Sequence, residues 1–162
     1  MESVNSSSNY FLNKSTYINL RWIGIIGQFL TINIVAFIFK FEFNYILSNV
    51  IVIFGAISNI FLISYNRSTQ LSNKISFYYL LADILQLSLL LYLTGGILNP
   101  FSVFLIIPSV FASSNLNIKT NLILILVTIL SISVLTLYHQ ELPSPLNAVS
   151  YTHLTLPTSV TV

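Results

Sequence analysis

The chain has 162 residues, of which six are Lys or Arg and four are Asp or Glu, and 55% are hydrophobic. A soluble domain of this length cannot bury so large an apolar fraction and needs more surface charge. The small net charge excludes a basic surface for nucleic acid, and the lack of cysteine excludes disulfides and thiolate metal sites. Composition therefore predicts an all-α, polytopic membrane bundle with lipid as its main surrounding.

Residues 1–17 are polar and rich in Ser and Asn, without the charged start and apolar core of a signal peptide. We expect this stretch to be a short disordered tail, followed by a multi-span domain over residues 18–139. Five apolar segments are predicted to cross the membrane: 22–39, 45–65, 75–93, 101–113 and 121–138. At about 1.5 Å of rise per residue, four of them cover the roughly 30 Å hydrocarbon core.

The fourth segment is short and contains Pro108, which removes one backbone hydrogen bond. If it extends from Asn99 to Leu116 it still crosses, as a kinked helix. An odd number of crossings leaves the C-terminal end on the opposite side from the N-terminus. Residues 140–149 are then an outside loop that leads to a sixth span, which we expect to be lost by truncation.

Loop charges predict the orientation of these spans. Lys40 lies on one side, and the other five basic residues are assigned to the opposite side: Lys14, Arg21, Arg67, Lys74 and Lys119. Cytoplasmic loops carry an excess of Lys and Arg, so this bias predicts a cytoplasmic N-terminus. The turn near residue 96 then faces outside.

The last residues differ in style from the rest. Ser150 to Thr158 reads Ser-Tyr-Thr-His-Leu-Thr-Leu-Pro-Thr. The nucleotide string TCT TAT ACA CAT CTG ACG CTG CCG ACG encodes it residue for residue and resembles a transposase-type sequencing adapter. We expect residues 150–162 to be adapter read-through, and the alternative is a genuine outside tail. Independent reads of the source contig at this point would decide.

Asp83 is the only acidic residue within a predicted span. A carboxylate in the membrane is expensive unless it is neutralised or partnered, and such residues are candidates for function. Gln86 shares a helix face with it, and Gln28 lies on a similar stripe of the first span. The alternative is that these polar side chains only hold helices together by interhelical hydrogen bonds.

A polar turn separates the third and fourth spans, from Thr94 to Phe101. Gly95 or Gly96 can supply a left-handed residue that ends one helix, and Asn99-Pro100 is a helix start. Local turn chemistry alone explains these residues. The functional alternative is that backbone N–H groups and the Asn99 amide, flanked by Tyr92 and Phe101, bind a flat lipid-soluble ring such as a quinone.

Three stretches resemble the membrane domain of RegB/PrrB/ActS-type redox sensor histidine kinases, over about residues 20–145. They are Arg21-Trp22-Ile23 with Gly27-Gln28, the run Asp83-Ile84-Leu85-Gln86-Leu87, and the run from Tyr92 to Phe101. Gly-Gly-x-x-Asn-Pro-Phe is the specific element. The resemblance implies that residues around this element sense the quinone pool: Tyr92, Gly95, Gly96, Asn99, Pro100 and Phe101.

The resemblance further implies a homodimer in the bacterial inner membrane, six spans, and a cytoplasmic part that uses ATP to phosphorylate its own histidine and then a response regulator. The phosphoacceptor histidine and ATP-site motifs do not occur in these residues, so ATP would bind only in a missing part. This fragment is therefore expected to have no catalytic residues and no metal site of its own.

Two other classes remain open. In a small transporter or channel subunit, Asp83 would lie on an ion path, although the sequence shows no second charge within the spans and no internal repeat. In a plain membrane scaffold, the polar stripes would serve packing alone. Downstream DNA encoding a sixth span and an ATP-binding domain would decide for the kinase.

Overall fold

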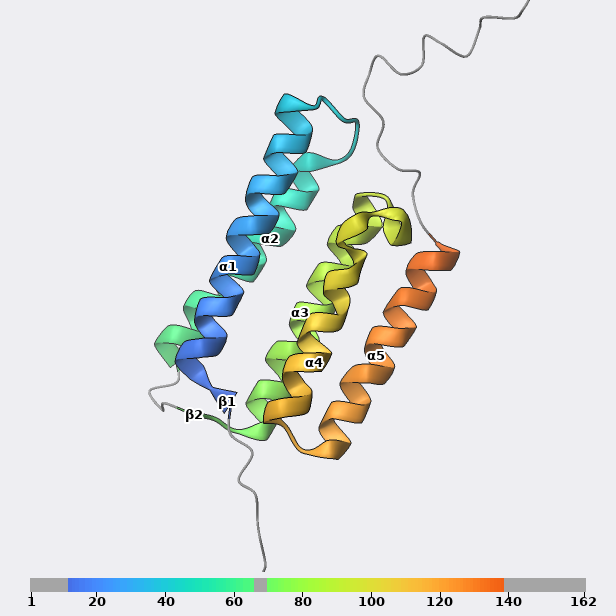
Figure 1. Ribbon diagram of the computed structural model, residues 1–162. Coiled ribbons are helices and arrows are strands. Elements are labelled where there is room, and N and C mark those ends of the chain that lie inside the picture. Colours follow the sequence, from blue (N-terminus) through green and yellow to red (C-terminus); the bar gives the residue numbers. More distant parts are fainter. Residues whose placement is uncertain (1–11, 66–69, 139–162) are drawn as a thin grey trace, which may run out of the picture.

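The computed structural model describes residues 12–65 and 70–138. Within them the chain runs up and down as antiparallel helices that lie side by side (Figure 1). The all-α fold class predicted from composition is confirmed. The expected outside loop 140–149 and the expected read-through 150–162 lie outside the described residues.

The first two spans form a pair at one side of the molecule. Helix α1 (Lys14–Asn33) continues into a π-helical turn, η1 (Ile34–Ile38), and α2 (Tyr45–Tyr65) returns beside it. Asn13 caps α1, because its Oδ1 accepts from the backbone N–H groups of Ser15 and Thr16 at 3.1 and 3.4 Å. The helix thus starts inside the stretch 1–17 that was expected to be a tail.

A two-residue ladder closes the end of the molecule where α1 begins. Strand β1 (Leu12–Asn13) pairs antiparallel with β2 (Gln70–Leu71), so that Leu12 faces Leu71. Both leucines are fully buried. This pairing joins the start of α1 to the segment that enters the third helix.

The remaining helices form a second group. Helix α3 (Asn73–Leu93) is followed by two 3₁₀ turns, η2 (Gly96–Leu98) and η3 (Pro100–Leu105), and by α4 (Ile106–Asn115) and α5 (Ile118–Leu137). Helix α3 packs against α2, α4 and α5. At their shared end, the Asn73 side chain donates to Thr120 Oγ1 at 2.9 Å and accepts from the Asn117 N–H at 3.1 Å.

Four helices in the described part of the chain are long and apolar enough to cross a membrane, within 14–38, 45–64, 73–93 and 118–137. The fourth expected span, 101–113, corresponds to the shorter apolar stretch Pro100–Asn115. Its first six residues are 3₁₀-helical, with a rise of about 2.0 Å, so the whole stretch reaches about 27 Å. The change in winding falls just before Pro108, whose ring would clash with the carbonyl of residue 104 in a regular α-helix.

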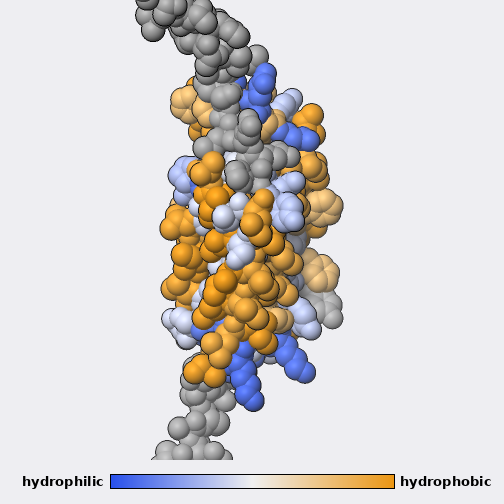
Figure 2. Space-filling view, turned by 90° about the vertical axis from the view of Figure 1, so that its right-hand side faces the viewer, coloured by the Kyte–Doolittle hydropathy of each residue, from blue (hydrophilic) through white to orange (hydrophobic). Residues whose placement is uncertain are grey.

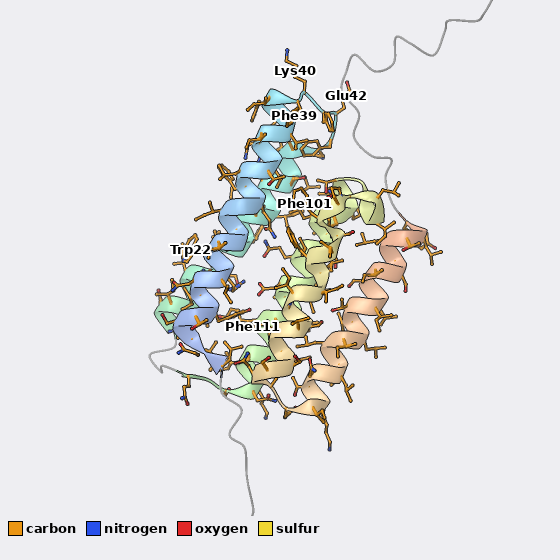
Figure 3. The ribbon with its side chains drawn as sticks, viewed as in Figure 1. Trp22, Phe39, Lys40, Glu42, Phe101 and Phe111 are labelled. Carbon is orange, nitrogen blue, oxygen red and sulfur yellow. The ribbon has the colours of Figure 1, made fainter. Side chains whose placement is uncertain are left out.

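The outer surface of the bundle is apolar in the middle and hydrophilic at its ends, as expected for helices that face lipid. Apolar side chains cover the middle of the face formed by α5, and hydrophilic residues gather towards the two ends (Figure 2). Leu122 and Ile129 of α5, for example, are 59% and 54% exposed. Lys40 and Glu42 lie at the end opposite the strands (Figure 3).

Candidate functional site

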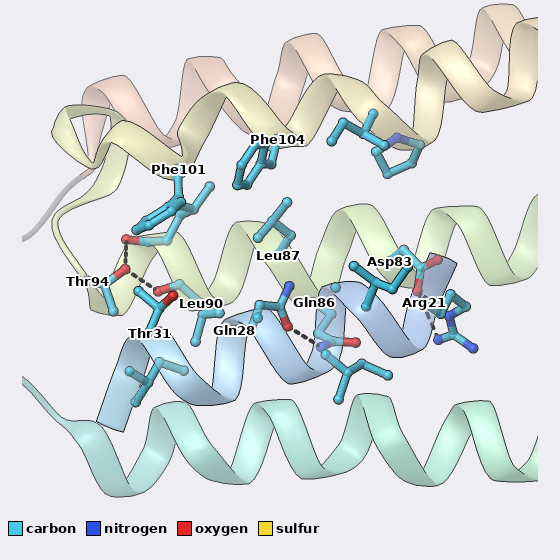
Figure 4. Close-up of a pocket in the computed structure, with 18 of the residues that line it drawn as sticks. Arg21, Gln28, Thr31, Asp83, Gln86, Leu87, Leu90, Thr94, Phe101 and Phe104 are labelled. Carbon is cyan, nitrogen blue, oxygen red and sulfur yellow. Dashed lines mark hydrogen bonds and ion pairs between the residues drawn. The ribbon is translucent and has the colours of Figure 1, made fainter. Parts of the chain in front are cut away.

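A cavity of about 650 Å³ lies between α1 on one side and η3 with α4 on the other, with α3 along its floor (Figure 4). Its walls are mostly apolar side chains, among them Leu87, Leu90 and Phe104. Its volume is in the range of small-molecule sites. Eight polar or charged side chains also line it: Tyr17, Arg21, Gln28, Thr31, Asp83, Gln86, Thr94 and Asn99.

One end of the cavity is closed by an ion pair between Arg21 and Asp83. Arg21 Nε donates to Asp83 Oδ1 at 2.9 Å, and the Tyr17 hydroxyl donates to Asp83 Oδ2 at 2.5 Å. The guanidinium also donates to Asn59 Oδ1 and Ser58 Oγ of α2, at 3.3 and 3.2 Å. Both oxygens of the Asp83 carboxylate thus accept a hydrogen bond. Through Arg21 the same cluster links α1, α2 and α3.

Two tyrosine rings complete this cluster. The Arg21 guanidinium lies 5.6 Å from the Tyr17 ring centre and 5.4 Å from that of Tyr79. Such cation–π contacts stabilise a cation that has been removed from water. The sequence placed Arg21 in a flanking loop, and that assignment is wrong, because the residue lies within α1 and is 7% exposed. The expectation that the spans contain no second charge besides Asp83 is wrong for the same reason.

The middle of the cavity holds a pair of amides. Gln86 Nε2 donates to Gln28 Oε1 at 3.3 Å, which links α3 to α1. The Gln86 amide also lies against Gly55 of α2, where an added Cβ would come within 2.5 Å of it. Gly24, Gln28 and Thr31 all line the cavity, so the polar stripe predicted on the first span faces inward.

The polar turn lies at the other end. Gly95 and Gly96 have positive φ values of 112° and 61°, and Asn99 with Pro100 begins η3, as the turn chemistry predicted. Asn99 Oδ1 accepts from the Phe101 N–H at 2.9 Å. Its Nδ2 donates to the Thr94 carbonyl and hydroxyl at 2.9 and 2.8 Å. The Asn99 donors are therefore occupied within the turn itself.

The residues predicted to contact a ligand separate into two groups. Asn99, Pro100 and Phe101 line the cavity, together with the three intramembrane residues Asp83, Gln86 and Gln28. Gly95 and Gly96 are buried in the turn, and Tyr92 is 38% exposed; none of these three lines it. Sequence reasoning missed Tyr17 and Thr94 as lining residues, although Thr94 directly precedes Gly95, which it had chosen.

Comparisons with known proteins agree with this architecture. Residues 17–159 match the family model of the PilS-like transmembrane domain. Sensor histidine kinase RegB of Cereibacter sphaeroides is 32% identical over 112 residues, which cover 67% of this chain and 24% of RegB. The chain thus spans about a quarter of the length of this relative. No solved structure matches. The chain belongs to the PilS-like transmembrane domain family and is a membrane region of the RegB sensor type.

Proposed function

We propose that this chain is the ligand-binding membrane region of a sensor histidine kinase, and that its ligand is a quinone held in the cavity. The cavity itself is the observation that supports this most strongly. It is mostly apolar and lies among membrane helices, with polar groups supplied by α1, α3 and the turn before η3. A quinone ring has two apolar faces and carbonyl acceptors at its edge, so it suits such a space.

The aromatic contacts come from the start of the fourth span. Phe101 and Phe104 both line the cavity, with ring centres 5.7 Å apart. They can pack on a ring that lies against Leu87 and Leu90 of α3. In this arrangement the Gly-Gly-x-x-Asn-Pro-Phe turn fixes the position of η3, and so of Phe101, while its glycines remain outside the cavity.

Signalling requires that the two redox forms of the ligand bind unequally to two helix arrangements, because a ligand shifts an equilibrium only through differential affinity. The whole protein would act as a homodimer in a bacterial inner membrane. Its cytoplasmic part would use ATP to phosphorylate a histidine and then a response regulator. A cytoplasmic N-terminus is supported by Lys14, Lys74 and Lys119, which begin three helices at one end of the described bundle.

The test is quinone binding to the chain in lipid nanodiscs. Trp22 is the only tryptophan; it does not line the cavity itself, but it packs against the core cluster that includes the lining residues Ile25 and Leu90, so a quinone bound there lies close enough to quench its fluorescence. We expect saturable quenching by short-tail ubiquinone or menaquinone. A cavity-filling variant, Gly24→Leu, should reduce the signal to the background of quinone dissolved in lipid. A Cβ at Gly24 meets no atom within 4 Å, so the added side chain starts in open space beside the cavity.

The matched control is Ile26→Phe. Ile26 is on the same helix and 53% exposed, and it does not line the cavity. This variant adds similar bulk to the lipid-facing side and should quench as the wild type does. Equal, non-saturable quenching in the wild type, Gly24→Leu and Ile26→Phe would exclude quinone binding in this cavity.

A further inference from the structure

The polar side chains that line the cavity differ in how many of their hydrogen-bonding groups are in use. Tyr17, Arg21 and Asp83 bind one another, and Asn99 binds Thr94. The Asn99 amide is fully used within the turn, and the Arg21 guanidinium donates to Asp83, Asn59 and Ser58 at the opposite end of the cavity from Phe101. A ligand carbonyl in the cavity must find its partner elsewhere.

Gln28 and Thr31 provide it. Among the described residues, Gln28 takes part in one side-chain hydrogen bond, as acceptor from Gln86, so both N–H groups of its amide remain available. The Thr31 hydroxyl makes no side-chain hydrogen bond in the same part of the chain, and it lies one turn further along α1. Both side chains point into the cavity, and Gln28 lies between the ion pair and the turn (Figure 4).

Resting on the proposed function, we propose that Gln28 is the residue that contacts the quinone carbonyl, and that the Gln28–Gln86 amide pair reads the redox state of the ring by reversing its direction. An oxidised quinone offers only acceptors, and it needs the Gln28 N–H. A quinol offers O–H donors, and it needs an acceptor. A terminal amide supplies either group after a rotation of about 180°.

The two glutamines cannot rotate independently. With Gln28 Oε1 turned to the cavity, its nitrogen faces Gln86, which must then present Oε1 in place of Nε2 to keep the bond. The reversal therefore reaches Gln86, whose amide is packed against Gly55 of α2. A change of hydrogen-bond direction at the ligand is passed through α3 to a helix that does not line the cavity. No covalent or redox step is involved.

The experiment uses the chain in lipid nanodiscs and makes two measurements. The first is the affinity of the chain for quinone and for quinol, and the second is the infrared carbonyl stretching frequency of bound ¹³C-labelled quinone. The replacement Gln28→Met keeps the length of the side chain and removes its hydrogen bonds. We expect it to weaken binding of each form roughly tenfold, the loss of one hydrogen bond to the ligand. The carbonyl stretch, lowered by the bond in the wild type, should return to its value in lipid.

Gln86→Met is the matched control, because it removes the same interhelical bond and leaves the Gln28 donor in place. It should keep the lowered carbonyl stretch that Gln28→Met loses, and the lipid-facing Ile26→Phe is the variant expected to bind both redox forms as the wild type does. With ¹⁵N-labelled glutamine, side-chain resonances of both residues should move between quinone and quinol in the wild type. Movement of the Gln28 resonance alone would overturn the coupled reversal.

The outcomes separate this inference from the proposed function. If the wild type binds quinone and Gln28→Met binds it with the same affinity and carbonyl stretch, the Gln28 contact is refuted while quinone binding stands. If the wild type shows no saturable binding, quinone binding and the amide reading fail together.

Discussion

Arg21 on α1 and Asp83 on α3 form an ion pair, in which Arg21 Nη2 lies 2.9 Å from Asp83 Oδ1. Their side chains are 5% and 19% exposed. Each charge is neutralised by the other, and the Tyr17 hydroxyl and the α2 side chains of Ser58 and Asn59 complete the partners. Removing one member of such a buried pair leaves a charge without a partner, which is far more costly than replacing both. The pair thus fixes the relative position of α1 and α3 near the end where the N-terminus enters.

The first prediction concerns this pair. Arg21→Met alone and Asp83→Leu alone should each lower the free energy of unfolding by about 3 kcal/mol or more. The double variant should be closer to the wild type than either single one. Unfolding in mixed detergent micelles, followed by circular dichroism, measures all three. Additive losses in the double variant would show that the two charges do not depend on each other.

A second prediction concerns the close approach of α2 and α3. Gly55→Ala places a Cβ within 2.5 Å of the Gln86 amide, so Gln86 must move and its bond to Gln28 breaks. Because the Gln86 amide is the far end of a flexible side chain, the cost should lie at the low end of the range for overpacking, about 1 kcal/mol. In the double variant Gly55→Ala, Gln86→Ala, the obstructing amide is gone and part of the stability should return. No recovery in a double-mutant cycle would contradict this contact.

The glycines of the turn should respond unequally to alanine. Both glycines have left-handed φ values, but the 61° of Gly96 is close to the value that other residues occasionally adopt, whereas the 112° of Gly95 is far from it. We expect Gly95→Ala to lose about 2 kcal/mol of unfolding free energy and Gly96→Ala about 1. Gly96→Asn should be milder than Gly96→Ala. The reverse order, by the same unfolding assay, would argue against this turn geometry.

The role of Asn99 can be divided with two substitutions. Asn99→Asp keeps the oxygen that accepts from the Phe101 N–H but loses both bonds donated to Thr94. Asn99→Ala loses all three. Loss of a cap typically costs about 1 kcal/mol, so we expect Asn99→Ala to be clearly less stable than the wild type. Because Asn99 positions η3, its loss should also weaken quinone binding through Phe101, without changing the carbonyl stretch of residual bound quinone.

Local chemistry made much of the fold predictable from sequence. The span predicted at 45–65 coincides with α2, and the third was placed within two residues of the start of α3. An apolar run ends where polar or helix-breaking residues begin, so the ends of a span can be read from the residues next to them in the sequence. The turn was predictable for the same reason, since Gly95, Asn99 and Pro100 each act on their own backbone.

Pairing between helices was not predictable in this way. Arg21 lies 62 positions before Asp83, and nothing in the local sequence states that the two residues meet. An arginine at the edge of an apolar run is typical of a membrane boundary, and this led to its assignment as a loop charge. Asn99 was expected to offer its amide to a ligand, but a side-chain partner five residues earlier, Thr94, takes it. Such competition is visible only once the turn is folded.

The position of the Arg21 cluster has a mechanical consequence. The cluster holds α1 to α2 and α3 near the start of α1. Along the rest of α1, the cavity separates this helix from the fourth span. Beyond the cluster, the described side chains hold α1 to α3 by the Gln28–Gln86 hydrogen bond and by apolar contacts such as Ile25 and Ile32 with Leu90, so a tilt of α1 about the cluster has to change only these contacts. From Arg21 to Ile38 the helical stretch is about 25 Å long at the helical rise per residue. A tilt of a few degrees would therefore move its far tip by more than an ångström, with α2 carried along, while the clamped end stays in place.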